Sequence, residues 1–203
     1  FLQTIKAAMC CQLKDQMGVE NIKKRDNQII DLVWDELKSI KSLNLLAGNI
    51  KNRLPIFSFS IEGLHYNLGV KILNDKFGIQ SRGGCSCAGT YGHYLLDIDE
   101  EKSKEIVCSI TKGDFSTKPG WIRISFHPTT TNEEVQFVVR AIKDLALNHK
   151  TWREDYNVNL FTGEITNKKN NGAFDIERHL ENCFDFSTLQ SHPQQLVESN
   201  KDL

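Results

Sequence analysis

A short segment rich in glycine and cysteine, lying between two strand-like runs, constrains the fold of this chain more than any other feature. Residues 81–90 read SRGGCSCAGT, after the run LPIFSFS at 54–60 and before the run WIRISF at 121–126. Glycines let a backbone take positive φ angles, and a thiol beside a guanidinium is held more easily as the thiolate. The pattern predicts a loop at strand ends that presents side chains for chemistry.

Apolar residues at three- and four-residue steps predict helices beside these strands. The other expected elements are helices at 2–17, 19–40, 65–77 and 99–112, a helix started within 85–98, a helix opening at the capping sequence Thr131-Asn132-Glu133-Glu134, and a short strand at 43–47. Helices packed on one face of a small, mainly antiparallel sheet of three or four strands make an α+β two-layer sandwich.

Composition excludes several classes of protein. A net charge of −1 over 203 residues gives no argument for a nucleic-acid partner or an anionic membrane, and no apolar run approaches the roughly 20 residues of a membrane span. The six cysteines have irregular spacing, with Cys10 and Cys11 adjacent, which argues against a disulfide scaffold. We therefore expect a chain that works in a reducing, cytoplasmic setting.

The helical and strand patterns predict two parts of the chain. Residues 1–150 are expected to form one domain, and residues 151–203 an extension that is partly irregular or disordered. Within the extension, residues 157–164 have the pattern of a hairpin around Thr162 and Gly163.

The order of these elements resembles the C-terminal small domain of class V aminotransferases, and in particular the cysteine desulfurase and selenocysteine lyase branch of the fold-type I pyridoxal-phosphate (PLP) enzymes. In that branch a loop carries an arginine, a glycine two residues later, and a Cys-Ala pair that begins five residues after the arginine. Arg82, Gly84 and Cys87-Ala88 match this spacing. The family's next strand carries an arginine that binds the substrate carboxylate, and Arg123 matches it. The resemblance covers about residues 1–148.

The resemblance implies roles for three residues. Cys87 is the nucleophile that takes sulfur from the substrate as a persulfide; the alternative is a structural thiol packed under the loop. Arg123 binds the substrate carboxylate through two parallel hydrogen bonds, unless it is an ordinary arginine on a solvated strand face. Strand alternation places it on the same face as Trp121 and Ser125. Arg82 neutralises the same carboxylate, lowers the thiol pKa, or braces the loop.

The chain also departs from the desulfurase pattern. Cys85 adds a second thiol, which either acts as a resolving thiol or binds a metal together with Cys87 and His93. Because this local set supplies only three ligands and no other cysteine pair completes it, we expect no metal. The segment between Cys87 and Arg123 is longer than in compact desulfurases, and its Tyr91 and His93 are candidates to line a pocket.

The resemblance further implies partners that these residues do not supply. The family's cofactor lysine, phosphate-binding loop and pyridine-pairing aspartate belong to a large N-terminal domain, whereas residues 1–50 here read as helices. We therefore expect the C-terminal portion of a larger, homodimeric enzyme that binds PLP and an amino-acid substrate, and a chain that alone binds no cofactor and is inactive. His149-Lys150 resembles the family's Schiff-base pair but follows the last helix of the small domain, and we expect a solvated helix end.

Two alternatives remain open on sequence grounds. One is an aminotransferase or isomerase of the same class that keeps this domain without persulfide chemistry. The other is a non-catalytic interaction module that shares only the two-layer fold.

Overall fold

The computed structural model of the chain describes residues 1–85, 89–159 and 161–169. The chain divides into two compact units, residues 1–166 and residues 167–203. The four-stranded sheet, the helices and the candidate site all belong to the first unit. The domain boundary expected at residue 150 stays a prediction.

Four antiparallel strands form the sheet, in the order β1-β2-β4-β3. They are β1 (Leu43–Leu45), β2 (Ile56–Ile61), β3 (Arg82–Gly84) and β4 (Trp121–Ser125). The α+β fold with a small antiparallel sheet is thus confirmed. One detail differs from the expectation: residues 82–84 were predicted as loop, but they pair with β4 and make an edge strand. A three-residue strand with two glycines has no alternating pattern, so nothing in its sequence predicts it.

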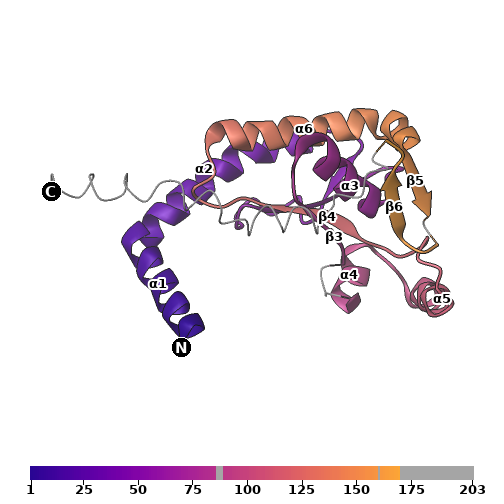
Figure 1. Cartoon of the computed structure of the whole chain (residues 1–203), viewed down its shortest axis with the longest axis horizontal. Helices are drawn as coiled ribbons and strands as arrows, with labels where there is room; N and C mark the ends of the chain where they lie inside the picture. Colours follow the sequence, from indigo (N-terminus) through magenta and orange to yellow (C-terminus); the bar gives the residue numbers. More distant parts are fainter. Residues whose placement is uncertain (86–88, 160, 170–203) are drawn as a thin grey trace, which may run out of the picture. The chain divides into compact units, whose positions relative to one another are not determined.

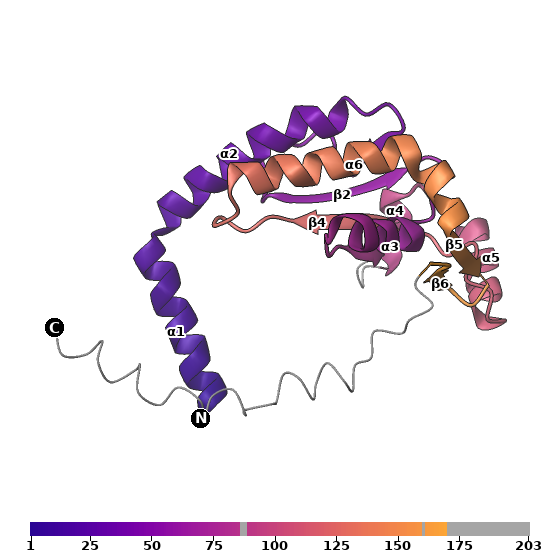
Figure 2. The same cartoon turned by 45° about the horizontal axis from the view of Figure 1, so that its top comes forward.

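Three helices cover one face of this sheet (Figure 1). They are α2 (Val19–Lys38), α3 (Tyr66–Phe77) and α6 (Asn132–Trp152). Figure 2 shows α2 and α6 side by side over the sheet. The large side chains that are fully buried in this layer are Ile29, Val33, Leu37, Phe57, Phe59, Ile72, Leu73, Ile122, Val135, Ile142 and Leu145. The core therefore lies between these helices and the inward side chains of β2 and β4.

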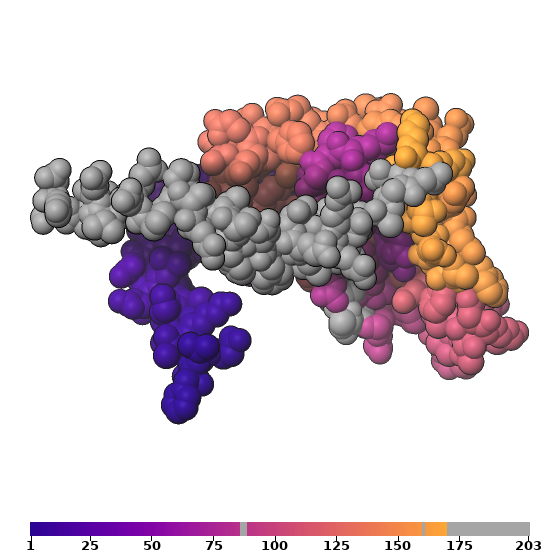
Figure 3. All heavy atoms as spheres, viewed as in Figure 1, coloured from indigo at the N-terminus to yellow at the C-terminus, as the bar shows by residue number. Residues whose placement is uncertain are grey.

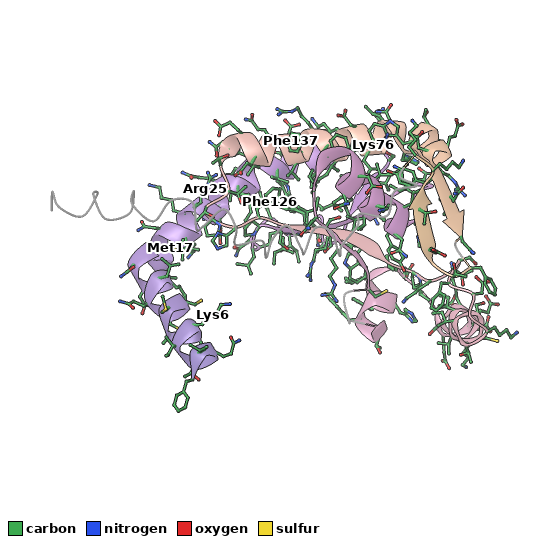
Figure 4. All side chains as sticks on the ribbon, in the orientation of Figure 1. Lys6, Met17, Arg25, Lys76, Phe126 and Phe137 are labelled. Atoms are coloured by element: carbon green, nitrogen blue, oxygen red, sulfur yellow. The ribbon has the colours of Figure 1, made fainter. Side chains whose placement is uncertain are left out.

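The helix ends fall close to the residues that the sequence predicted. Thr131 and Glu134 form a reciprocal capping box at the start of α6, and Gly78 ends α3 in the left-handed conformation with φ 66°. Arg25 of α2, labelled in Figure 4, donates to Asn132 Oδ1 at 2.8 Å and to the Thr130 carbonyl at 2.5 Å. The first turn of α6 is thereby fixed to α2.

The C-terminal end of α6 corrects one expectation. His149 is 5% exposed, and its Nδ1 lies 3.1 Å from the carbonyl oxygen of Ala146, so the prediction of a solvated histidine is wrong. The reason is helical spacing: Ile142, Leu145 and His149 lie on one stripe, because α6 continues to Trp152. Lys150, one residue further, is exposed as expected.

Beyond α6, a hairpin forms where the sequence predicted it. Its strands are β5 (Tyr156–Asn159) and β6 (Glu164–Asn167), preceded by the 3-10 turn η1 (Arg153–Asp155). Tyr156 is buried, and Asp155 pairs with Lys76 of α3 at 3.3 Å.

The first helix, α1 (Leu2–Met17), has the predicted amphipathic pattern but no buried residue. Leu2 is 82% exposed and Leu13 is 57% exposed, and Ile5 and Met9 are also exposed. On the side of α1 seen in Figure 3, no other helix and no strand covers its lower part. Among the described residues, no helix combines the length and the apolar character needed to cross a membrane.

Candidate functional site

The face of the sheet that points away from α2 and α6 carries Arg123, as the alternation predicted. Arg123 lies in the middle of β4, directly between Ser58 of β2 and Arg82 of β3. Side chains paired directly across antiparallel strands point to the same side of a sheet. The neighbouring inward positions on β4, Ile122 and Ile124, are buried in the core.

A short helix covers part of this second face. It is α4 (Gly89–Leu95), which lies on the opposite side of the sheet from α6 (Figure 1). A Cβ atom added at Gly92 would lie 3.5 Å from Cη2 of Trp121 and 3.3 Å from Cβ of Cys85. Because α4 packs against its ring, Trp121 is only 4% exposed although it shares the face of Arg123.

A cavity of about 470 Å³ lies on this face and includes Arg123. Its lining includes Ser58, Arg53 and Arg123, and Tyr91 and Trp121 add a phenol and an indole N–H to a mainly apolar wall. The other lining residues are Leu46, Ala47, Ile50, Ile56 and Leu95. The described lining thus combines two cations and no carboxylate with a mainly apolar wall drawn from β2, β4, α4 and the loop after β1.

The two arginines of the cavity differ in what they bind. Arg53 donates from Nε to the Ile50 carbonyl at 2.8 Å and from its Nη atoms to the carbonyls of Leu46 and Ala47. Its guanidinium also lies 4.9 Å from the ring centre of Trp34. Arg53 therefore holds the loop after β1. Half-buried Arg123, by contrast, makes no hydrogen bond or ion pair with any residue of the described part of the chain.

Arg82 lies next to this cavity without lining it. Its Cα is paired with that of Arg123, and its side chain is exposed. The substrate-binding role expected for Arg82 stays a prediction.

Glycines near the loop leave room for an aromatic ring. A Cβ at Gly83 would lie 2.9 Å from Cδ2 of Tyr66, and one at Gly120 would lie 2.7 Å from Cδ1 of Tyr66 and from Cα of Gly84. Of the two glycines in β3, Gly84 has positive φ, 104°, and Gly83 does not. Gly83 is therefore needed for the close approach of the Tyr66 ring, whereas Gly84 also uses the backbone freedom of glycine.

The thiol of Cys85, directly after β3, is hydrogen-bonded and partly buried. Its Sγ donates to the Pro119 carbonyl at 3.1 Å. Burial raises the pKa of the Cys85 thiol, and the nearby Lys118 charge only partly offsets this rise. A guanidinium in the same loop was expected to favour the thiolate, but at Cys85 desolvation of the charged form is the larger effect.

The remaining expected site residues have mixed outcomes. Cys87, with Ala88, lies outside the described residues. Tyr91 lines the cavity as expected, whereas His93, half-buried on the same helix, does not. Within the described residues, no three His, Cys, Asp or Glu side chains gather closely enough to hold a metal ion. Because Cys87 lies outside them, the set of Cys85, Cys87 and His93 remains untested.

Sequence reasoning missed several residues of this site. No sequence pattern indicates the role of Arg53, because its partners are backbone carbonyls of its own loop. Tyr66 was read only as part of a helix, and its role depends on glycines far away in sequence. Ile56 was predictable, since in an alternating strand it must face away from the buried Phe57.

We predict that Gly120→Ala destabilises the chain by about 1–3 kcal/mol, because the added methyl overlaps the Tyr66 ring and the backbone of Gly84. Gly89→Ala is the matched control, since a Cβ there meets no atom within 4 Å. Urea denaturation monitored by circular dichroism measures both variants. Equal midpoints for the two variants would contradict this packing.

We also predict that Cys85 reacts slowly with iodoacetamide near neutral pH. A raised thiol pKa leaves less thiolate at a given pH, so labelling of Cys85 should rise at higher pH than labelling of the exposed Cys108. Peptide mass spectrometry over pH 7–10 gives the labelling rate of both thiols. A raised pKa shifts the pH at which the rate increases, whereas poor solvent access lowers the rate at every pH. Coincident pH profiles would refute the raised pKa.

Known proteins resemble this chain in sequence and in structure. The family model described as "Aminotransferase class-V" matches residues 4–138. Among the solved structures that match is the apo structure of cysteine desulfurase from Thermococcus onnurineus NA1, at 20% identity and a TM-score of 0.46, over 66% of this chain and 28% of that one. No curated protein matches the chain. Since the family model covers well over half of its residues, the chain belongs to the class V aminotransferase family.

Proposed function

We propose that this chain provides the substrate-binding side of a PLP-dependent class V enzyme, in which Arg123 binds the carboxylate of an amino-acid substrate. The family is PLP-dependent. One observation carries the proposal: Arg123 is half-buried and lines a cavity, without a hydrogen-bond or ion-pair partner among the described residues and without an acidic neighbour in the described lining.

The physical argument rests on desolvation. A charged group that loses water without gaining a partner destabilises the fold, and a bound anion offsets that cost. The planar guanidinium can form two parallel hydrogen bonds to a carboxylate, which is a geometry that lysine does not reproduce. Arg53 cannot compete for the substrate in this role, because its donors are committed to backbone carbonyls.

The described lining of the cavity does not fit the cofactor by itself. PLP is held through a lysine and a phosphate site, and the Arg123 cavity includes no lysine and no helix N-terminus of eight residues or more. Our proposal therefore assigns the cofactor to other residues of the protein, such as the N-terminal large domain expected from the resemblance. The chain spans 28% of the desulfurase structure that it matches.

Two reactions are compatible with this proposal. Sulfur transfer to Cys87 is supported by the position of Cys87 shortly after β3, which pairs with the strand that carries Arg123. A class V reaction without persulfide chemistry is supported by the apolar cavity wall. Release of alanine and sulfide from cysteine by the full-length protein separates them. Activity that disappears in Cys87→Ala and persists in Cys108→Ala indicates sulfur transfer, and full activity of Cys87→Ala excludes it.

For Arg123 the expected outcome is specific. In the full-length enzyme, Arg123→Ala should lower kcat/KM by about 100-fold or more, because it removes a charged partner of the substrate carboxylate. Arg123→Lys should recover only part of this loss. The control is Arg140→Ala, which removes an exposed arginine on α6. Wild-type kcat/KM in Arg123→Ala would remove the basis of the proposed function.

A further inference from the structure

We infer that the substrate of this site is an amino acid with a bulky apolar side chain, which lies against the apolar wall of the Arg123 cavity while its carboxylate binds Arg123. This inference rests on the proposed function, because it assumes that Arg123 binds the carboxylate. It adds the chemical class of the group next to that carboxylate, and it favours the reaction without persulfide chemistry.

The first step of the argument is size. The cavity of about 470 Å³ falls within the range of roughly 300–1,000 Å³ that is typical of small-molecule sites. A carboxylate needs only the immediate surroundings of one guanidinium. Most of the cavity is therefore left for the remainder of the substrate.

The second step is the position of the apolar side chains around Arg123. Trp121 lies two residues before Arg123 on the same face of β4, and Ile56 lies two residues before Ser58, the cross-strand neighbour of Arg123. Side chains at such spacings along paired strands are close neighbours on one face. A carboxylate on Arg123 thus has apolar side chains close by along both strands, of which Ile56 is the exposed one and Trp121 is almost fully buried.

The third step is the exposure of the remaining wall. Ile50 is 51% exposed, Ile56 39% and Tyr91 61%, although all three line one cavity. The ring of Tyr91 stacks on that of Tyr94, with their centres 6.3 Å apart. Exposed apolar surface gathered in a concave site gains free energy when an apolar group covers it. A small polar side chain such as that of cysteine would leave this surface in water.

The fourth step is the small number of free polar groups in the described lining. Arg53 already donates to three carbonyls of its loop, and the described lining has no carboxylate or amide side chain. Besides Arg123, its remaining hydrogen-bonding groups are the hydroxyls of Ser58 and Tyr91 and the indole N–H of Trp121, which is buried without a partner. A cationic substrate side chain would therefore lose water contacts without an acidic partner among these residues.

The test compares two carboxylates that differ in apolar bulk. The purified chain is titrated with propanoate and with 3-phenylpropanoate, and NMR monitors the Trp121 indole and the Arg123 Nε–H signals. We expect 3-phenylpropanoate to bind at least about tenfold more tightly. Ile56→Ser should reduce this preference about fivefold, because it weakens binding of 3-phenylpropanoate more than binding of propanoate. The control is Val107→Ser on α5 (Glu100–Thr111), which changes an exposed apolar residue outside the cavity.

The outcomes distinguish this inference from the proposed function. Equal affinities for the two carboxylates, both lost in Arg123→Ala, would overturn the inference and leave the role of Arg123 intact. A preference for 3-phenylpropanoate that persists in Arg123→Ala would overturn the carboxylate role, and with it the inference as stated. Absence of any shift at Trp121 and Arg123 with either compound would overturn both. A preference that requires Arg123 and weakens in Ile56→Ser supports the inference.

Discussion

The pairing of β2 with β4 is the interaction on which the rest of this structure depends. It aligns Phe57 with Ile124 and Phe59 with Ile122, so that four apolar side chains face the helices together. The same register, read on the other face, aligns Ser58 with Arg123. A slip of one residue would exchange the two faces and place the guanidinium in the core. The burial of Phe57 and Phe59 therefore also fixes the direction in which Arg123 points.

Much of this arrangement follows from short-range pattern. The alternation of β2 and β4, the capping box at Thr131 and the glycine at the end of α3 each depend on a few neighbouring residues. Local rules of this kind predicted the α+β fold and the face that carries Arg123. In the strands they apply because β2 and most of β4 bury one face only, so apolar and polar residues alternate; Trp121, which α4 covers, is the exception.

The features that sequence did not predict depend on contacts between distant residues. Gly83 and Gly120 are small because the ring of Tyr66 needs the space, and no local pattern contains that information. The pKa of Cys85 rises because other segments bury it, so the arginine in the loop does not predict the protonation of this thiol. His149 is buried because α6 packs along its full length. In each case the deciding quantity is either close packing or burial by distant segments, which only the assembled fold determines.

The exposed apolar side of α1 has a consequence for the helix itself. Isolated helices of about 12–15 residues are marginally stable in water, and α1 has 16 residues with no buried side chain. Its backbone hydrogen bonds therefore lack the tertiary support that α2 and α6 share, and local opening of α1 needs little free energy. Amide hydrogen exchange in α1 would respond directly to any surface that covers Leu2, Ile5, Met9 and Leu13. The helix–coil equilibrium of α1 therefore shows whether another surface covers its apolar side.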